Sequence, residues 1–252
     1  MYIFYSSPRP VVMLAEPFSQ SQSTVLLIED EAQVRRAVRV ALRSVTGHLL
    51  EADTGRAALA TLDTHRPDLI ILDLGLPDMA GVAVCHAIRA YSTAPILVLT
   101  GYQEESEKVK LLNAGADDYV TKPFGSLELV ARVSAQLRRA RTTLLPQAST
   151  TVIIGELVLD FESRAAARAE TPVRLTPTEW SLLRVLLAAN GQVLAHQQLF
   201  DAVWGQSYGD VRQYLRVHIT NLRKKIERDP TNPRIVVTEP SVGYRLDRRR
   251  AE

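Results

Sequence analysis

The chain has 252 residues, of which 46% are hydrophobic and 23% charged, values typical of a globular protein with one large or two ordinary domains. One cysteine, Cys85, excludes an internal disulfide framework and favours a reducing, cytoplasmic setting. No run approaches ~18 consecutive apolar residues, so no membrane-spanning helix is expected. The net charge is only +2, but residues 24–124 carry 10 basic and 14 acidic residues, whereas residues 210–250 carry 11 basic and 5 acidic. This asymmetry predicts two domains, with nucleic acid as a candidate partner of the second.

Residues 1–23 are rich in Ser, Gln and Pro and have no basic segment before their short apolar stretch. They are predicted to be a disordered extension and not a signal peptide. Met13 is a candidate for the start of translation.

From residue 24 to residue 140, apolar strand-length runs alternate with amphipathic helical patterns. The strands lack polar alternation, as expected when both faces are buried. This repetition predicts an α/β fold with a five-stranded parallel, doubly wound sheet of the flavodoxin-like type. The expected strands cover residues 25–28, 48–52, 69–72, 96–99 and 119–121, and the expected helices cover residues 34–45, 55–64, 82–91, 104–114 and 126–139.

Polar side chains follow these strands at their carboxyl ends, where ligands bind in such sheets. They are Glu29 and Asp30, then Asp73, Thr100 and Lys122. Clustered carboxylates without Cys or His favour a hard divalent cation, Mg²⁺ or Mn²⁺. The pattern predicts a site in which Asp73 accepts a phosphoryl group, Lys122 pairs with the acids, and Thr100 donates a hydrogen bond to a phosphoryl oxygen. Lys122-Pro123 is a candidate cis peptide bond.

Residues 141–151 are expected to be a linker, and residues 152–248 a second domain with a different pattern. Short segments at residues 154–161, 165–169 and 173–175 predict a small antiparallel sheet. Thr176, Pro177 and Glu179 then form the signature of a helix start with a capping box. Helices near residues 177–190, 197–204 and 211–227 precede a hairpin at residues 234–246. This is the order of an α+β winged helix-turn-helix, with Trp180 and Trp204 expected in its core.

The helix at residues 211–227 has two unlike faces. One carries an apolar stripe of Leu215, Ile219, Leu222 and Ile226, which predicts packing on the domain core. The other is polar and basic, which predicts a recognition helix for the DNA major groove, with Arg216 among the residues nearest the bases. The expected DNA-binding residues are Arg212, Gln213, Arg216, Thr220, Asn221, Arg223, Lys224 and Lys225, together with Arg245 in the hairpin.

The segments "LLIEDE", "PDLIILDLGLPDMAG", "APILVLTG" and "AGADDYVTKPF" resemble the receiver domain of bacterial two-component response regulators. The segments "LTPTEWSLLRVLL", "VHITNLRKKIERDP" and "GYRL" resemble the winged-helix output domain of the OmpR/PhoB class. The segments "LDLGLPD", "LTPTEW" and "YLRVHITNLRKKIERDPTNPR" are similar to those of the KdpE-like, potassium-responsive regulators. The resemblance covers nearly the whole chain apart from residues 1–23 and the linker.

The resemblance implies a role for each residue of the site. Asp73 is the expected phosphoacceptor, and Thr100 and Tyr119 are the expected switch pair. Lys122 is the expected lysine that pairs with the acids and then with the phosphoryl group. The expected metal ligands are Glu29, Asp30, Asp73 and the backbone carbonyl of Gly75. One departure is Gly101, where many relatives have a small residue with a side chain.

The resemblance also implies partners: a sensor histidine kinase, double-stranded promoter DNA, a second copy of the chain on phosphorylation, and RNA polymerase. No membrane contact is expected. A symmetric homodimer would form through the face of residues 104–139, with cross-pairs such as Lys108–Glu128 and Asp118–Arg132. The expected dimer residues are Lys108, Asp117, Asp118, Glu128, Arg132 and Arg139.

Two alternatives remain open at this point. The chain could be a phosphorylation-independent transcription factor that uses its first domain only to dimerise, against which the full acid pocket argues. It could also be an aspartate-nucleophile phosphohydrolase, but such enzymes place a second Asp two residues after the first, where this chain has Gly75. The preferred prediction is a regulator and not an enzyme.

Overall fold

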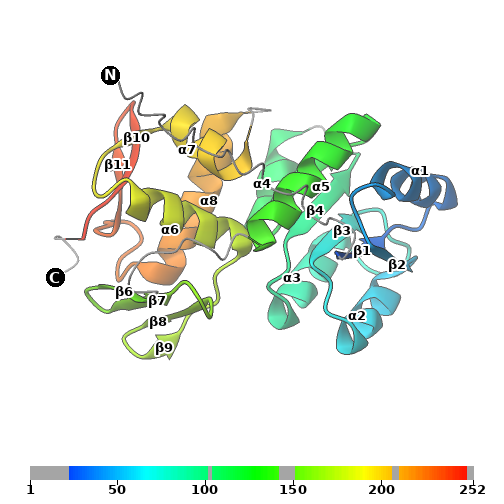
Figure 1. Cartoon of the computed structure of the whole chain (residues 1–252), viewed down its shortest axis with the longest axis horizontal. Coiled ribbons are helices and arrows are strands. Elements are labelled where there is room, and N and C mark those ends of the chain that lie inside the picture. Colours follow the sequence, from blue (N-terminus) through cyan, green and yellow to red (C-terminus); the bar gives the residue numbers. More distant parts are fainter. Residues whose placement is uncertain (1–22, 102–103, 142–150, 206–209, 249–252) are drawn as a thin grey trace, which may run out of the picture.

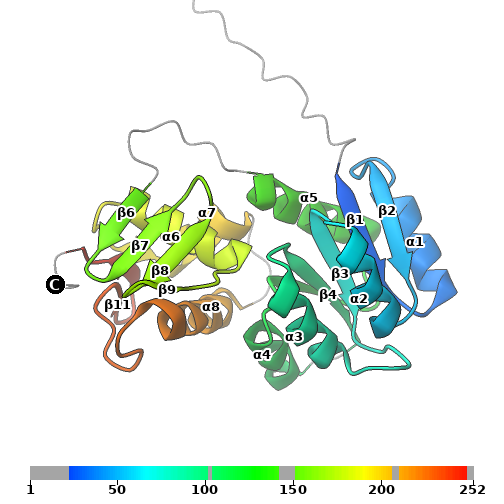
Figure 2. The same ribbon diagram turned by 90° about the horizontal axis from the view of Figure 1, so that it is seen from below.

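The computed structural model describes residues 23–101, 104–141, 151–205 and 210–248. The predicted extension at residues 1–23 and the linker at residues 141–151 therefore lie almost wholly outside the described residues. Figures 1 and 2 show two bodies side by side, with the N-terminal α/β domain in blue to green and the C-terminal domain in yellow-green to red.

The N-terminal domain is a five-stranded parallel sheet in the order β2-β1-β3-β4-β5. The predicted α/β fold is confirmed. The strands are β1 (Thr24–Ile28), β2 (His48–Ala52), β3 (Leu69–Asp73), β4 (Ile96–Thr100) and β5 (Asp118–Thr121). The helices are α1 (Ala32–Leu42), α2 (Gly55–Thr64), α3 (Gly81–Tyr91), α4 (Glu105–Asn113) and α5 (Ser126–Arg141).

Helices cover both faces of this sheet, as the uninterrupted apolar strands predict. Alternate residues of the central strands enter separate cores. Leu27 and Ile71 pack with residues of α1 and α5, such as Val38 and Val133. The other face packs against α2, α3 and α4, for example through Leu112. Because the strands are parallel and in register, their carboxyl ends meet at one edge of the sheet, which is where the polar side chains lie.

The C-terminal domain consists of two antiparallel sheets and three helices, as expected for a winged helix. A four-stranded sheet contains β6 (Thr151–Ile154), β7 (Leu157–Asp160), β8 (Ala165–Arg168) and β9 (Thr171–Pro172). The helices are α6 (Pro177–Ala188), α7 (His196–Trp204) and α8 (Val211–Ile226). A three-stranded sheet contains β10 (Leu194–Ala195), β11 (Val236–Glu239) and β12 (Gly243–Leu246).

Two predicted strands of this domain are wrong. Residues 154–161 are not one strand, because the chain turns at Gly155, where φ is +55°, and β6 and β7 pair as a hairpin. Residues 173–175 are not a strand, since the ladder between β8 and β9 ends at Pro172 apart from one hydrogen bond from Val173 N to Ala166 O. The short strand β10 was not expected. It forms by pairing with β12, which lies about fifty residues further along the chain.

Local sequence signals fix the start and the packing of the helices. The predicted capping box of α6 is confirmed: the Glu179 amide donates to Thr176 Oγ1 (3.3 Å) and the Thr176 amide donates to Glu179 Oε2 (2.7 Å). The predicted stripe of α8 is also buried, at Leu215, Ile219, Leu222 and Ile226. Trp180 and Trp204 are buried as expected.

A close backbone approach requires Gly243 in the hairpin. A Cβ atom added there would lie 1.9 Å from the carbonyl oxygen of Leu194, so only glycine allows β12 to pair with β10. Within the described residues, no helix is long and apolar enough to cross a membrane.

Candidate functional site

Three carboxylates meet at the carboxyl edge of the parallel sheet. Glu29 and Asp30 follow β1, and Asp73 ends β3; one oxygen from each lies within 4.8 Å of the others. Glu29 and Asp73 are buried, whereas Asp30 is partly exposed and opens the cluster to solvent. Such a group of oxygen donors has the chemistry that a hard divalent cation prefers.

Lys122 joins the cluster from the loop after β5. Its Nζ lies 2.8 Å from Glu29 Oε2 and 2.8 Å from Asp73 Oδ1. Partial burial by itself lowers the pKa of Lys122, but the hydrogen bonds with Asp73 and Glu29 outweigh it, and the net pKa is raised. The ammonium group therefore stays charged and neutralises part of the acid cluster. The peptide bond between Lys122 and Pro123 is cis, which confirms the sequence prediction.

Burial is the largest influence on Glu29. It raises the pKa of this carboxyl group, and Asp73 raises it further, while the hydrogen bond from Lys122 lowers it. The three carboxylates and the one lysine of the cluster thus leave negative charge that a divalent cation would complement. The backbone amide of Gly75 donates to Asp73 Oδ2 (3.1 Å), so the backbone of Gly75 lies beside the expected phosphoacceptor.

Thr100 and Tyr119 lie on neighbouring strands. Thr100 ends β4 and is buried, and its carbonyl accepts from the Lys122 amide (2.7 Å), so the threonine and the lysine are tied together. Tyr119 faces away from the acid cluster: its ring stacks on Tyr214 of α8 with centroids 5.2 Å apart, and Lys108 Nζ lies 5.3 Å from its ring centroid. Gly101 has open space around a notional Cβ atom, so packing does not demand glycine there.

The receiver-like domain and the C-terminal domain share an interface at β5, α4 and α5. Asp117 is the first of two residues around which the hydrogen bonds of this interface gather. Asp117 Oδ2 accepts from Arg89 NH2 (2.5 Å), and its Oδ1 accepts from the Thr178 amide of α6 (3.1 Å). The backbone carbonyl of Asp117 accepts from Trp204 Nε1 (3.5 Å).

Asp118 is the second residue around which hydrogen bonds of the interface gather. Its Oδ1 accepts from Arg132 NH1 (2.9 Å) and from the Tyr214 hydroxyl of α8 (3.0 Å). Arg132 also donates to Glu128 Oε1 (2.7 Å). Asp118, Arg132 and Tyr214 are all buried. The pair Asp118–Arg132 that the sequence suggested between two copies is therefore formed within one chain.

Further contacts extend this interface along α5 and α4. Arg139 NH1 donates to Val203 O (3.1 Å), and Asn221 Nδ2 of α8 donates to Leu112 O (3.3 Å). Helix α8 thus lies against α4, as Figures 1 and 2 also show. Of the expected dimer residues, Asp117, Asp118, Arg132 and Arg139 are buried in this arrangement, whereas Lys108 and Glu128 are at least partly exposed.

The predicted DNA-binding residues fall into three groups. Arg212, Arg216, Thr220 and Lys224 form an exposed row along α8, and Gln213 beside this row is partly exposed. Asn221 is engaged with the receiver-like domain, and Lys225 Nζ pairs with Glu179 Oε2 (2.7 Å). Arg223 instead donates to Val236 O (2.6 Å) and holds α8 to the hairpin.

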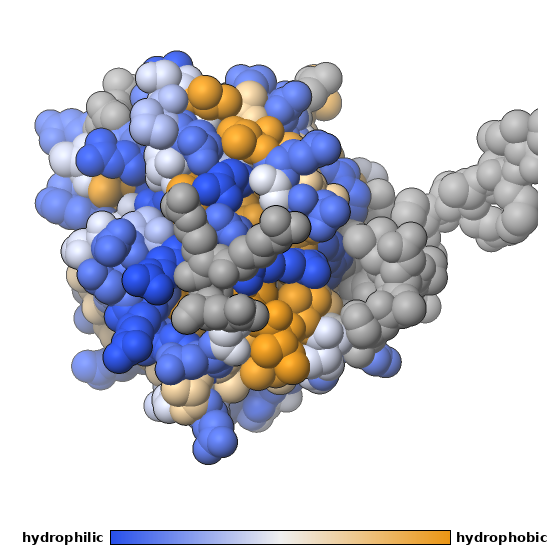
Figure 3. All heavy atoms as spheres, turned by 90° about the vertical axis from the view of Figure 1, so that its left-hand side faces the viewer, coloured by the Kyte–Doolittle hydropathy of each residue, from blue (hydrophilic) through white to orange (hydrophobic). Residues whose placement is uncertain are grey.

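The hairpin carries Arg245, which is paired with Glu239 and Asp247 at 2.7 Å each. Figure 3 views the end of the molecule that carries β10 and β11, where hydrophobic groups lie among hydrophilic ones. Exposed Val193 and Val242 belong to this part of the chain.

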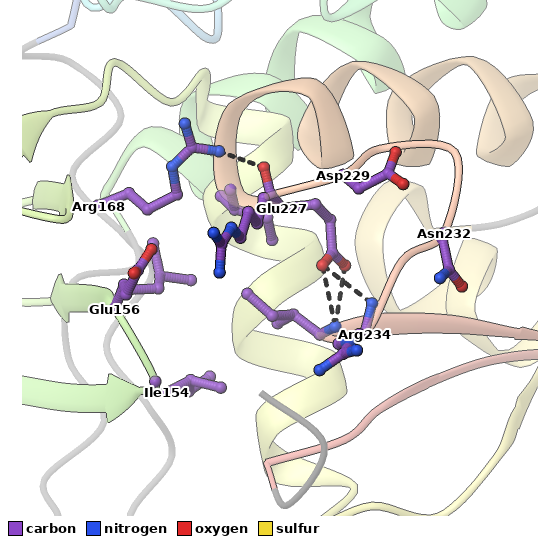
Figure 4. Close-up of a pocket in the computed structure, with 12 residues that line it drawn as sticks. Ile154, Glu156, Arg168, Glu227, Asp229, Asn232 and Arg234 are labelled. Carbon is purple, nitrogen blue, oxygen red and sulfur yellow. Dashed lines mark hydrogen bonds between the residues drawn. The ribbon is translucent and has the colours of Figure 1, made fainter. Parts of the chain in front are cut away.

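A cavity of about 650 Å³ lies elsewhere in the C-terminal domain, between β6–β7 and the end of α8 (Figure 4). The carboxylate of Glu227 accepts from the backbone amides of Arg234 (3.0 Å), Ile235 (2.9 Å) and Val236 (2.9 Å). Arg168 donates to the carbonyl of Glu227. These contacts tie the end of α8 to β11, and the lining mixes acidic with basic side chains, so the cavity does not define a ligand.

Comparison with known proteins agrees with this geometry. Residues 25–134 match the response regulator receiver domain, and residues 170–246 match the C-terminal domain of transcriptional regulatory proteins. The chain therefore belongs to the two-component response regulators of the OmpR/PhoB class, which are DNA-binding transcription regulators.

Among its relatives, the chain is similar to the KDP operon transcriptional regulatory protein KdpE of Escherichia coli, with 43% identity over 89% of this chain and 99% of that protein. It is 40% identical to KdpE of Mycobacterium tuberculosis, over 88% of this chain and 98% of the relative. A solved structure of a RitR mutant superimposes with a TM-score of 0.73 and 25% identity, covering 90% of this chain and 99% of that chain.

Several residues that matter at the interface were not found from the sequence. Tyr214, His218 and Thr178 lie at the contact between the domains, and Arg89 pairs with Asp117 from α3. The one sequence signal for Tyr214 and His218 was their position on α8, because both residues lie next to its apolar stripe and not in it. Nothing in the sequence indicated what they would contact.

Proposed function

We propose that this regulator is switched by phosphorylation of Asp73 by a sensor histidine kinase in the cytoplasm. The observation that carries the proposal is the cluster of Asp73, Glu29, Asp30 and Lys122, because it places a nucleophilic carboxylate beside a cation and two further acids. The phosphoryl group would leave a histidine nitrogen of the kinase as an oxygen of Asp73 forms the new bond to phosphorus.

The donor set fits Mg²⁺ or Mn²⁺. Glu29, Asp30 and Asp73 supply carboxylate oxygens within 4.8 Å of one another, and the carbonyl of Gly75 is proposed as a further ligand. When bound, the cation neutralises charge on the transferring phosphoryl oxygens. Lys122 is positioned to exchange its contact with Asp73 for one with the new phosphoryl group, which carries roughly −1.5 to −2 charges.

Thr100 and Tyr119 are proposed to carry the signal to the surface. A hydrogen bond from the Thr100 hydroxyl to a phosphoryl oxygen would draw Thr100 toward Asp73 and leave room for the ring of Tyr119 to turn inward. Tyr119 now stacks on Tyr214 of α8, so the inward turn would remove one contact that holds the DNA-binding domain.

Closure and dimerisation are proposed to compete for one surface. The C-terminal domain contacts Asp117, Asp118 and Arg139, and Arg132 is buried beside Asp118; these are four of the six proposed dimer residues. Release of α8 would therefore uncover the dimer surface. It would also free Asn221, which together with Arg216 and Thr220 is proposed to read bases in the major groove. Arg212, Gln213, Arg223, Lys224, Lys225 and Arg245 would mainly contact the DNA backbone.

The similarity to KdpE supports a role at a potassium-transport operon, with RNA polymerase as a further partner. The decisive experiment compares the full chain with Asp73→Asn in the presence of Mg²⁺ and acetyl phosphate. Wild type should form dimers in analytical ultracentrifugation and bind promoter DNA more tightly, whereas Asp73→Asn should do neither. Equal stimulation of both proteins would sink the phosphorylation switch and favour a regulator that acts without it.

A further inference from the structure

His218 lies on α8 where the C-terminal domain meets the receiver domain. It lines a cavity of about 220 Å³ that has one wall from each domain. The receiver wall consists of Leu112, Asn113, Gly115 and Ala116, and the opposite wall consists of Thr176, Glu179, His218, Asn221, Lys224 and Lys225. Separation of the domains would therefore remove the receiver wall and open His218 to water.

The closed arrangement buries the imidazole without satisfying it. His218 is only 3% exposed, and its ring packs on Trp204 with centroids 5.2 Å apart. Within the described part of the chain, His218 Nε2 has no hydrogen-bond partner. A neutral ring tolerates this environment, but a protonated ring would hold a buried cation with an unpaired N–H group.

The charged groups around His218 come from both domains. Asp117 precedes β5 and Arg139 lies on α5, while Lys224 and Lys225 lie on α8 itself and Glu179 on α6. Burial lowers the pKa of His218 to about 4; Asp117 acts against this shift, and Arg139 and Lys225 add to it. The environment as a whole disfavours the imidazolium.

We propose that His218 makes domain closure sensitive to protons, so that acidification releases α8 from the receiver domain. The neutral ring fits the closed interface, and the protonated ring is stable only when the domains separate and water reaches it. The response does not require phosphorylation of Asp73, and it would set how easily the unphosphorylated protein opens.

The direction and size of the effect follow from linkage. His218 has a pKa of about 4 in the closed state, and a hydrated histidine has a pKa of about 6.5. Closure is thus fully favoured above about pH 6.5 and is weakened as the pH falls toward 4. Between pH 7 and pH 5, the equilibrium constant for opening should rise about twentyfold.

Glu179 lines the same cavity, but it would act in the opposite direction. Burial raises the pKa of its carboxyl group. The buried carboxyl group of Glu179 therefore takes up a proton more readily than an exposed one. Through this residue, a lower pH would favour the closed state. Opening on acidification is the signature of His218.

The Thr178 amide is a natural reporter of opening. It lies in the first turn of α6, where amides have no partner within the helix, and it donates to Asp117 Oδ1 across the interface (3.1 Å). Its hydrogen-exchange protection factor can be measured by NMR on the unphosphorylated full chain at pH 7 and pH 5, corrected for the intrinsic exchange rate. The Val236 amide, which donates to Glu227 within one domain (2.9 Å), is the internal reference.

We expect the protection of Thr178 to fall about twentyfold in the wild type between pH 7 and pH 5, with Val236 unchanged. In His218→Phe, which keeps a ring against Trp204, the fall should be less than about twofold; His218→Gln serves if the Phe variant does not fold. A pH response retained in the folded His218 variant, or absent from the wild type, overturns the proposal. So does an equal loss at Val236, which would report global unfolding. Because no phosphodonor is used, none of these outcomes bears on Asp73.

Discussion

Replacing Tyr214 with Phe should loosen the closed arrangement while leaving the core of the C-terminal domain intact. The Tyr214 hydroxyl donates to Asp118 Oδ1 across the interface (3.0 Å), and this is its contact with a buried carboxylate. Phe keeps the ring that stacks on Tyr119, so the loss is confined to the hydroxyl group. Asp118 keeps its ion pair with Arg132 (2.9 Å), so no charge is left without a partner.

The expected magnitude follows from the acceptor. A hydrogen bond to a charged group contributes roughly 1.5–3 kcal/mol. Since Arg132 still compensates Asp118 in the variant, the lower end applies, about 1.5 kcal/mol. That free energy corresponds to about a tenfold increase in the equilibrium constant for opening.

The assay is binding of the unphosphorylated protein to a 30-base-pair duplex of mixed sequence at low salt. If only the open state binds DNA, the apparent affinity scales with the open fraction, so Tyr214→Phe should bind about tenfold more tightly than the wild type. Tyr91→Phe is the matched control, because Tyr91 is 81% exposed. Unchanged DNA binding together with unchanged exchange of the Thr178 amide would refute the reasoning that this contact restrains α8.

Three further predictions concern DNA reading and stability. Arg216→Ala should relax the sequence preference in a binding-site selection more than it changes the salt dependence of DNA affinity. Lys224→Ala should reduce the slope of log affinity against log salt concentration by about 1 and leave the sequence preference unchanged. The reverse pattern would mean that Lys224 reads bases and Arg216 contacts phosphate. Gly243→Ala should lower the free energy of unfolding by about 1–3 kcal/mol in urea, because its Cβ would lie 1.9 Å from Leu194 O, whereas Gly101→Ala should have little effect. Glu227→Gln should lower the free energy of unfolding in urea by about 1.5–3 kcal/mol, since the Glu227 carboxylate accepts hydrogen bonds from three backbone amides. A smaller change would mean that water replaces those contacts.

The sequence predicted the receiver fold well because its signals are local and repeated. Unbroken apolar strands can be buried only between two helical layers, and parallel strands bring their carboxyl ends to one edge. Those two facts alone place Asp73 near Glu29, Asp30 and Lys122, and the structure brings these four residues together. The same applies to α6, whose start is set by Thr176, Pro177 and Glu179 within one turn.

Errors arose where neighbours in space decide the outcome. Residues 154–161 alternate as a strand should, yet Gly155 allows a turn that pairs β6 with β7. The two-residue strand β10 has no periodicity to detect, and it exists because Gly243 lets β12 approach it. In both cases the hydrogen-bond partners are distant or depend on a single backbone angle.

The sequence by itself determined the acid cluster, the capped helix α6 and the amphipathic α8, because each rests on residue spacing within one element or on strand order. Only the tertiary structure decided what the polar side of α8 touches. Tyr214 and Asn221 are spaced along one helix, but their hydrogen-bond partners Asp118 and Leu112 come from another domain, and so does the cavity wall that faces His218. No periodicity encodes contacts between separately folded units, since they depend on how two finished surfaces match in shape and charge.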